Sequence, residues 1–364
     1  MKKKIVYIDG WFLKPPLRGV GKYIQNIITS IPRPQNEIEY VLLIPSADIV
    51  IKSLPSFLKI NLIPCKFILI WYEFIVPKTL RKDNSYIFFP SGICGITNTI
   101  PKKKVFSTIH DISALLPFNL SPMSFKLRQI LGRLYRYLSF YILIRKSNII
   151  FTVSETAKRD IKNLLSKKNI NVPFIMAVNN ASEINISKIN KKNKNFICIT
   201  GDSRQKNYKI IINALDYIDE SVLKDWKIFL IGLNENKSIF HPSGAEIKIK
   251  KYLNSYEIKK LMMKSYCLIF PSLYESFGIP LVDAMRTGCY IVASNQGATK
   301  EICCENALYF NPNSAKDLSI NILKVISKYP IQPLINKDNL AFQQTWEKTS
   351  KEIFDKIVKM IIMN

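Results

Sequence analysis

Two acidic residues with seven residues between them lie in a segment that could bind a ligand with hydroxyl groups at both ends. Glu275 precedes a glycine–proline turn, and Asp283 lies on a helix that we expect to begin near Pro280, because proline is tolerated in a first helical turn. Backbone N–H groups at a helix start bind phosphates, here those of Phe277, Gly278 and Ile279. The segment predicts a diphosphate site with a sugar at one end and a ribose at the other. A chance pair of acids beside an ordinary turn is the alternative.

Parallel sheets would position these residues. Short apolar runs alternate with helical patterns along the chain, which is typical of a sheet with crossover helices. The expected strands are 5–8, 40–44, 87–89, 105–109 and 149–153 in the first half, and 196–200, 227–231, 246–250, 267–270 and 290–294 in the second. Open sheets of this kind bind ligands where their strands end, and the candidate residues follow strands.

The chain is long enough, at 364 residues, for two α/β domains. A polar stretch rich in lysine and asparagine, 179–195, separates the two series of strands and is the expected linker. We predict an N-terminal Rossmann-like acceptor domain over 1–180 and a C-terminal Rossmann-like donor domain over 181–345. An amphipathic helix over 346–364 should close the chain and pack back toward the N-terminal domain.

The charge balance is strongly basic, with 53 Lys and Arg against 27 Asp and Glu and a net charge of +26. Such an excess favours a polyanionic neighbour, such as anionic lipid, nucleic acid or a phosphorylated substrate. A solubilising lysine-rich surface explains the same number.

The seven cysteines show no metal-ligand spacing, which fits buried thiols in a reducing cytoplasm. The longest apolar run, 67–76, is shorter than the roughly 20 residues that span a bilayer, so we expect a soluble or membrane-associated protein.

The segment 270–288 resembles the donor-binding signature of retaining glycosyltransferases of family four. That family has the GT-B fold, in which two Rossmann-like domains face a cleft, and carries two glutamates separated by seven residues. The resemblance implies that Glu275 contacts hydroxyl groups of the transferred sugar and that Asp283 contacts the nucleotide ribose. Asp283 is one methylene shorter than the family's glutamate, so its reach toward the ribose is shorter.

The loop 201–207 resembles the family's loop after the first strand of the donor domain. The resemblance implies that Lys206 contacts the donor phosphates, where a cation would offset the negative charge of the departing nucleoside diphosphate. Many relatives also carry an arginine after the glycine or before the lysine, where this chain has Asp202 and Gln205. Arg204 either takes that place or is a solvated loop residue.

Two segments of the first half extend the resemblance. Gly19 and Gly21 lie in a stretch similar to the family's glycine-rich loop, which approaches the donor phosphates and the acceptor. A tight strand–helix turn would need the same glycines. His110, followed by Asp111, resembles the family's His–Asp pair beside the reacting sugar. The resemblance therefore implies that Glu275, His110 and Lys206 are the catalytic residues.

No Asp-x-Asp triplet occurs, so the usual carboxylate pair for a divalent metal on a sugar diphosphate is missing. We therefore expect no metal and no cofactor besides the nucleotide-sugar, which is a co-substrate. Lys206 and helix N-termini would meet the charge of the leaving group instead.

The function predicted is a retaining, metal-independent hexosyltransferase of lipopolysaccharide or capsule synthesis, with a lipid-linked or polysaccharide acceptor. GDP-mannose is the first donor to test and a UDP-sugar the second, because family members with similar residues around His110 and Lys206 often resemble mannosyltransferases. A basic nucleic-acid-binding protein is one alternative, although no zinc-finger spacing or RNA-recognition signature is found and no nucleic-acid partner is expected. A sugar-nucleotide epimerase on the same fold is the other.

A basic helix is expected over 125–144, where Arg128, Arg133 and Arg136 alternate with leucine, isoleucine and tyrosine. Such a helix could lie on the anionic inner face of the cell membrane. A helix packed on the core with a solvated basic back predicts the same pattern. Both interpretations are open at the level of sequence.

Overall fold

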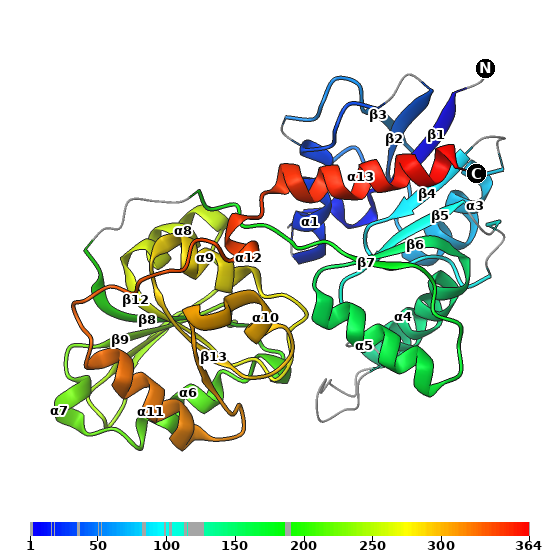
Figure 1. Cartoon of the computed structure of the whole chain (residues 1–364). Coiled ribbons are helices and arrows are strands. Elements are labelled where there is room, and N and C mark those ends of the chain that lie inside the picture. The colour runs from blue at the N-terminus through cyan, green and yellow to red at the C-terminus, as the bar shows by residue number, and fades with distance from the viewer. Residues whose placement is uncertain are drawn as a thin grey trace. The chain divides into compact units, whose positions relative to one another are not determined.

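The computed structural model describes residues 3–15, 17, 19–34, 37–49, 51, 53–81, 85–97, 100–101, 104–112, 115, 127–185 and 191–363, and the side chains of 127–129 are outside this description. Arg18 and Phe125, at the starts of two predicted segments, also lie outside the described residues. The chain forms two compact units (Figure 1). Among the described residues, the first unit holds those up to 115, those of 127–180 and those from 345 onward, and the second holds 181–185 and 191–344.

The first unit is built on a parallel sheet whose strands lie in the order β3-β2-β1-β4-β5-β6-β7. The strands are β1 (Lys4–Asp9), β2 (Ile38–Ile44), β3 (Lys59–Leu62), β4 (Ser85–Phe89), β5 (Val105–Ile109), β6 (Ser147–Thr152) and β7 (Ile175–Ala177). All five strands expected in this half are confirmed. The two strands not predicted are short edge strands, and β3 is largely exposed, so it lacks the apolar run of a buried strand.

Helices cover the faces of this first sheet. They are η1 (Trp11–Leu13), α1 (Gly19–Thr29), α2 (Ile68–Ile70), η2 (Trp71–Ile75), α3 (Val76–Thr79), α4 (Leu127–Lys146), α5 (Glu155–Lys167) and α13 (Trp346–Ile362). The amphipathic pattern of the last helix is confirmed, because Ile353, Ile357 and Ile361 are buried. The α13 helix packs beside α1 (Figure 1), and its Phe354 ring contacts Tyr40 and Phe88 of the sheet at 5.2 and 5.8 Å between centroids.

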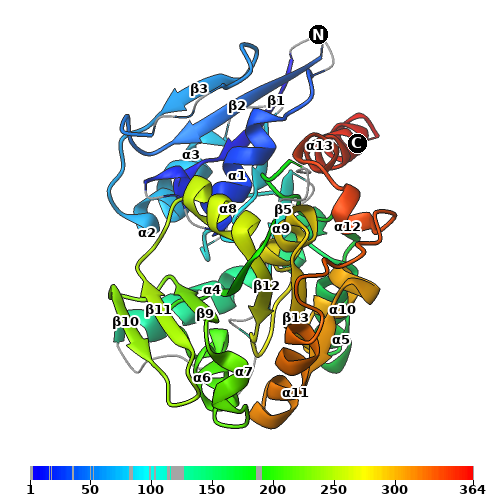
Figure 2. The same cartoon turned by 90° about the vertical axis from the view of Figure 1, so that its left-hand side faces the viewer.

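The second unit is built on a sheet in the order β10-β11-β9-β8-β12-β13-β14, and Figure 2 labels β10, β11, β9, β12 and β13 of it. Its strands are β8 (Asn193–Ile199), β9 (Lys227–Ile231), β10 (Lys237–Phe240), β11 (Glu246–Lys250), β12 (Ser265–Phe270), β13 (Tyr290–Ser294) and β14 (Leu308–Phe310). The five expected strands are confirmed. The sheet is parallel except at one edge, where the unpredicted strand β10 forms an antiparallel hairpin with β11 through a turn containing Gly244, at φ +81°.

The helices of the second unit are η3 (Arg204–Lys206), α6 (Lys209–Leu215), α7 (Glu220–Leu223), α8 (Ser255–Lys264), α9 (Ile279–Thr287), α10 (Thr299–Cys303), η4 (Cys304–Asn306), α11 (Ala315–Ile326) and α12 (Leu340–Gln343). The α9 helix begins where the proline predicted, after Gly278 at φ +93°. The core of the second unit includes an aromatic cluster in which Trp226 contacts Phe196, Tyr266 and Tyr329.

The chain passes from the first unit to the second between residues 180 and 181, inside the expected linker 179–195, but several described residues of this stretch are packed. Asn180 and Ser182 are buried, and β8 already begins at Asn193. Lys192 is also buried, and its ammonium donates to the carbonyl oxygens of Thr287 and Met262 at 2.7 and 3.4 Å, at the C-terminal ends of α9 and α8. Cations stabilise helix C-termini. The composition did not predict this burial, because Lys192 binds backbone carbonyls of the core and Ser182 binds the Asp283 carboxylate.

Candidate functional site

Each sheet has a point where the strand order reverses, and ligands bind open α/β sheets at the carboxyl ends of the strands there. In the second unit this point lies between β8 and β12, which are neighbours in the sheet. The loop after β8 carries Lys206, and the loop after β12 carries Glu275. The topology therefore brings together two candidate residues that are 69 positions apart in the chain.

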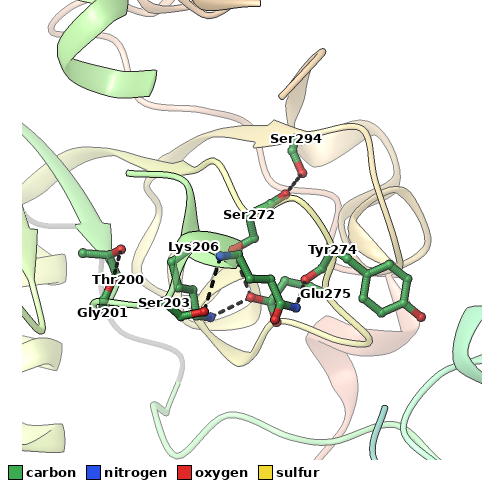
Figure 3. Close-up of polar contacts among 9 residues, drawn as sticks. Thr200, Gly201, Ser203, Lys206, Ser272, Tyr274, Glu275 and Ser294 are labelled. Atoms are coloured by element: carbon green, nitrogen blue, oxygen red, sulfur yellow. Dashed lines mark hydrogen bonds and ion pairs between the residues drawn. The ribbon is translucent and has the colours of Figure 1, made fainter. Parts of the chain in front are cut away.

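Lys206 and Glu275 form an ion pair, and their side chains point toward one another in Figure 3. The Lys206 Nζ lies 2.6 Å from Glu275 Oε1, and Ser272 donates its hydroxyl to the same oxygen at 2.9 Å. The two side chains are 35% and 18% exposed, so a ligand can reach both. Burial opposes the charged ammonium, but the charge and hydrogen bond of Glu275 outweigh it and raise the pKa of Lys206.

The two loops are fastened to each other by polar residues next to Lys206. Gln205 donates its side-chain amide to the Tyr274 carbonyl at 2.8 Å, and its own carbonyl accepts from the Leu273 amide at 2.8 Å. Asn207, in the left-handed region at φ +51°, donates to the carbonyls of Pro271 and Pro312. Both residues position the lysine. Arg204 is exposed on η3.

A glycine in the loop after β13 sets the position of Glu275. The backbone of Gly297 has φ +65°, and a Cβ atom there would lie 2.2 Å from the Glu275 carbonyl oxygen. Only glycine permits this approach. The Ala298 amide donates to the same carbonyl at 2.8 Å, and Ser294 donates to the Ser272 carbonyl at 2.6 Å. Three loops therefore hold the carboxylate in place.

The α9 helix carries the second acid of the predicted pair. Asp283 accepts a hydrogen bond from the hydroxyl of Ser182, in the segment before β8. Phe277 is buried, Gly278 is the N-cap, and Ile279 is the first helical residue. The predicted phosphate-binding N–H groups therefore lie at a helix start, as expected.

In the first unit, His110 follows β5 and its ring is fixed by two contacts. Its Nε2 donates to the Pro90 carbonyl at 2.7 Å, and its ring meets that of Tyr23 edge-on at 4.5 Å. The Tyr23 hydroxyl is bonded to Thr108 Oγ1 at 3.0 Å. Burial is the main cause that lowers the pKa of His110, so the ring is neutral at pH 7 and Nδ1 carries the lone pair.

The two glycines before Tyr23 differ in what their surroundings require. A Cβ atom at Gly21 would lie 2.5 Å from the Phe12 carbonyl oxygen, so packing alone explains that glycine. A Cβ atom at Gly19 would meet no atom within 4 Å. Packing therefore does not require glycine at position 19.

Several residues near the candidate site were missed by sequence reasoning. Gly297 and Ser182 give no local signal, because Glu275 and Asp283, which they contact, are distant in the chain. Ser272 lies three positions before its partner Glu275, so its place in the motif was the available signal. Asp9 could have been found from the sequence, because it is an acid at the end of the predicted strand 5–8. It accepts hydrogen bonds from the side chains of Trp71 and Tyr72, each at 2.8 Å. Burial, partly offset by these hydrogen bonds, raises the pKa of Asp9 to about 6.

Comparison with known proteins places this geometry in a family. The model of the family described as glycosyl transferases group 1 matches residues 179–339, which include Lys206, Glu275 and Asp283. Residues 179–339 therefore form a glycosyl transferases group 1 domain. Of the interpretations left open by the sequence, the match supports the transferase.

A curated relative of the chain is the O-antigen chain mannosyltransferase RfbU of Salmonella typhimurium, which is 26% identical over 274 residues covering 72% of each chain. Among solved structures, HepE of Anabaena in complex with UDP and glucose superposes with a TM-score of 0.62 at 13% identity, covering 99% of this chain and 100% of that one. WaaG, a glycosyltransferase involved in lipopolysaccharide biosynthesis, gives the same score and identity, covering 99% and 100%. These likenesses confirm the predicted GT-B fold.

In the part of the chain that the structure describes, no helix has the length and hydropathy to cross a bilayer.

Proposed function

We propose that the chain transfers a hexose from a nucleotide-sugar to a glycan or glycolipid acceptor, with retention of configuration at the anomeric carbon. The observation that carries this proposal is the pairing of Lys206 with Glu275 at the switch point of the second sheet. A nucleotide-sugar carries partners for both groups, because its diphosphate is anionic and its sugar presents hydroxyl groups. Binding of the donor would separate the pair and give each residue a new partner.

The charges of these two residues match those of the transition state. As the glycosidic bond to the diphosphate breaks, positive charge develops at the anomeric carbon and negative charge on the leaving oxygen. Lys206, whose raised pKa keeps it charged at neutral pH, would stabilise the leaving group. Glu275 would accept hydrogen bonds from the sugar, and these strengthen as the ring becomes cationic. The neutral His110 would contact a hydroxyl of the reacting sugar.

The donor proposed first is GDP-mannose, with a UDP-sugar second. The relative named as an O-antigen mannosyltransferase favours mannose and an envelope polysaccharide or its lipid-linked precursor as the acceptor. The solved neighbour that holds UDP and glucose favours a uridine nucleotide.

The proposal is tested by screening the purified full chain against GDP-mannose, UDP-glucose, UDP-galactose and the free nucleoside diphosphates in a thermal-shift assay. A donor at about 100 times its Kd should add roughly 2.7 kcal/mol to the free energy of unfolding. Transfer to extracted lipid-linked glycans is then followed by NMR of the anomeric proton. Retained configuration supports the proposal, and an inverted product or no binding by any nucleotide contradicts it.

Metal independence is a second prediction. If Lys206 neutralises the diphosphate, the initial rate of transfer in EDTA should stay within about twofold of the rate in Mg²⁺, since a single charge partner can supply the stabilisation. Loss of transfer in EDTA, restored by Mg²⁺ or Mn²⁺, would show that carboxylates of this chain recruit a metal.

We also propose that the first unit docks on the anionic inner face of the cell membrane. The C-terminal half of α4 is packed, with Phe140 and Leu143 buried, whereas its N-terminal half exposes apolar residues. A second exposed apolar segment lies on α2 and η2, and Glu73 of η2 accepts a hydrogen bond from Tyr135 of α4, which ties the two segments together. We call this the apolar–basic surface, and its exposed apolar residues are Phe67, Leu69, Ile70, Phe74, Ile130, Leu131, Leu134 and Leu138.

The charge of the apolar–basic surface complements anionic lipid. Segments 66–81 and 127–146 contain one acid, Glu73, and its carboxylate already accepts from the amides of Ile96 and Thr97. The same segments contain eight basic residues: Lys66, Lys78, Arg81, Arg128, Arg133, Arg136, Arg145 and Lys146. A basic surface with an apolar centre is the pattern of a peripheral membrane protein.

The expected result is tight binding to phosphatidylglycerol vesicles at low salt, weak binding to phosphatidylcholine vesicles, and loss of binding near about 0.5 M salt. Arg133→Gln with Arg136→Gln should weaken binding about 30-fold, at about 1 kcal/mol for each arginine. The matched control is Lys316→Gln with Lys324→Gln on α11 of the second unit. Equal binding by both variants in a vesicle co-sedimentation assay would mean that the excess charge acts diffusely.

A further inference from the structure

The Asp283 carboxylate is held by a serine 101 positions earlier in the chain. Ser182 donates its hydroxyl to Asp283 Oδ1, and the oxygen of the same hydroxyl accepts from the Ile184 amide at 2.9 Å. A hydroxyl has one proton to donate, so accepting from Ile184 leaves that proton directed at the carboxylate. Ser182 is only 5% exposed, which limits competition from water. The direction of the Asp283 side chain is thereby fixed.

The segment that carries Ser182 is itself clamped by an arginine of the same helix as Asp283. Arg286 is buried and lies three residues further along α9. Its guanidinium donates from Nη1 to the carbonyls of Ser182 and Ile184 at 3.3 and 3.0 Å. Its Nε and Nη2 donate to the Phe342 carbonyl at 3.2 and 2.8 Å, and Nη2 also to the Gln344 carbonyl at 2.5 Å. The planar, forked guanidinium suits this set of carbonyls, and a lysine ammonium would not span it.

These contacts have a consequence for ligand recognition. An aspartate reaches less far than a glutamate, so its contact with a hydroxyl depends on the carboxylate being held in the productive orientation. A side chain fixed before binding loses less conformational entropy when it accepts a ligand hydroxyl. The Ser182 hydroxyl restrains the Asp283 carboxylate directly. Arg286 restrains it indirectly, because its guanidinium holds the backbone of the segment that carries Ser182.

We propose that Ser182, clamped by Arg286, is a positioning residue that makes Asp283 selective for the ribose of the donor nucleotide. The inference rests on the proposed function, because it assumes that a nucleoside diphosphate binds beside α9. It concerns the distinction between ribose and deoxyribose, which is separate from the identity of the sugar or the base.

The test compares the Kd values for GDP and for 2′-deoxy-GDP and 3′-deoxy-GDP by titration calorimetry on the full chain, with the UDP series used if UDP binds more tightly. Wild-type protein should prefer the ribonucleotide by about tenfold or more over at least one deoxy analogue, as expected for a hydrogen bond to a charged group. Ser182→Ala should reduce this preference to about threefold or less. Ser182→Thr keeps the hydroxyl and should keep most of the preference.

Two further variants separate positioning from general destabilisation. Ser265→Ala removes another buried serine of the second unit, whose hydroxyl donates to the Leu261 carbonyl at 2.9 Å, and it should leave the preference unchanged. Asp283→Asn should abolish the preference, and adding Ser182→Ala to it should change nothing more, because the serine acts through the aspartate.

The outcomes distinguish the two proposals. Binding of GDP or UDP with an unchanged ribose preference in Ser182→Ala would overturn the positioning role, because the serine would then be only structural. A preference that survives Asp283→Asn would overturn it as well, because the ribose would lie elsewhere. Failure of wild-type protein to bind any nucleoside diphosphate would overturn the proposed function and this inference with it. If Ser182→Ala does not fold, Arg286→Lys replaces it in the test, because a lysine ammonium cannot span the carbonyls that hold the Ser182 segment. Folded Arg286→Lys should show a reduced ribose preference, and an unchanged preference would overturn the positioning role.

Discussion

Glu275→Gln is expected to lower kcat for sugar transfer about 100- to 1000-fold while leaving the Kd of the nucleoside diphosphate within about threefold of wild type. The amide has the shape of the carboxylate, so the contacts of its backbone with Gly297 and Ala298 should persist. It lacks the negative charge that stabilises a cationic sugar ring. A contribution made mainly in the transition state lowers kcat and kcat/KM together.

The measurement is steady-state kinetics with the donor identified in the binding screen, together with calorimetry for the free nucleotide. Glu220→Gln, an exposed glutamate at the start of α7, is the matched control. We expect the free energy of unfolding to change by less than about 1 kcal/mol in either variant, because the Lys206–Glu275 pair is partly exposed and screened by solvent. Near-wild-type kcat with weakened nucleotide binding would remove Glu275 from the reacting centre.

Lys206→Ala is expected to lower kcat/KM by a similar factor, about 100- to 1000-fold, and to weaken binding of the nucleoside diphosphate as well. Nucleotide binding should weaken in Lys206→Ala and not in Glu275→Gln, because the diphosphate that Lys206 would contact is already anionic before the bond breaks. Lys206→Arg keeps the charge and should recover part of the nucleotide binding. Because the pKa of Lys206 is raised above its ordinary value of 10.5, this binding should not change with pH between about 6 and 9 through titration of the lysine.

The matched control for this variant is Lys209→Ala, which removes an exposed lysine at the start of α6, three positions further along. If Lys206→Ala and Lys209→Ala bind the nucleoside diphosphate equally well, the phosphate site lies elsewhere and Arg204, on the same short helix, becomes the candidate. Thermal unfolding of both variants checks that the loop is intact.

Much of the fold was predictable because strands buried in a parallel sheet are continuous apolar runs. All ten expected strands are present. The strands that escaped prediction lie at sheet edges, where β3 and β10 face solvent and lack that pattern. The polar stretch 179–195 contains the passage between the two units, but the burial of its residues was not predictable, since Lys192 and Ser182 look like surface residues until the carbonyl and carboxylate groups they bind are known.

The sequence by itself determined which chemical groups stand at the ends of the strands, because strand periodicity, the proline of α9 and the motif around Glu275 are all local patterns. Only the tertiary structure decided which of those groups meet. Lys206 pairs with Glu275 because β8 and β12 are neighbours in the sheet, and Ser182 meets Asp283 across 101 positions because Arg286 clamps its segment to α9. Such contacts depend on which loops from distant parts of the chain come together, and local residue preferences do not determine that.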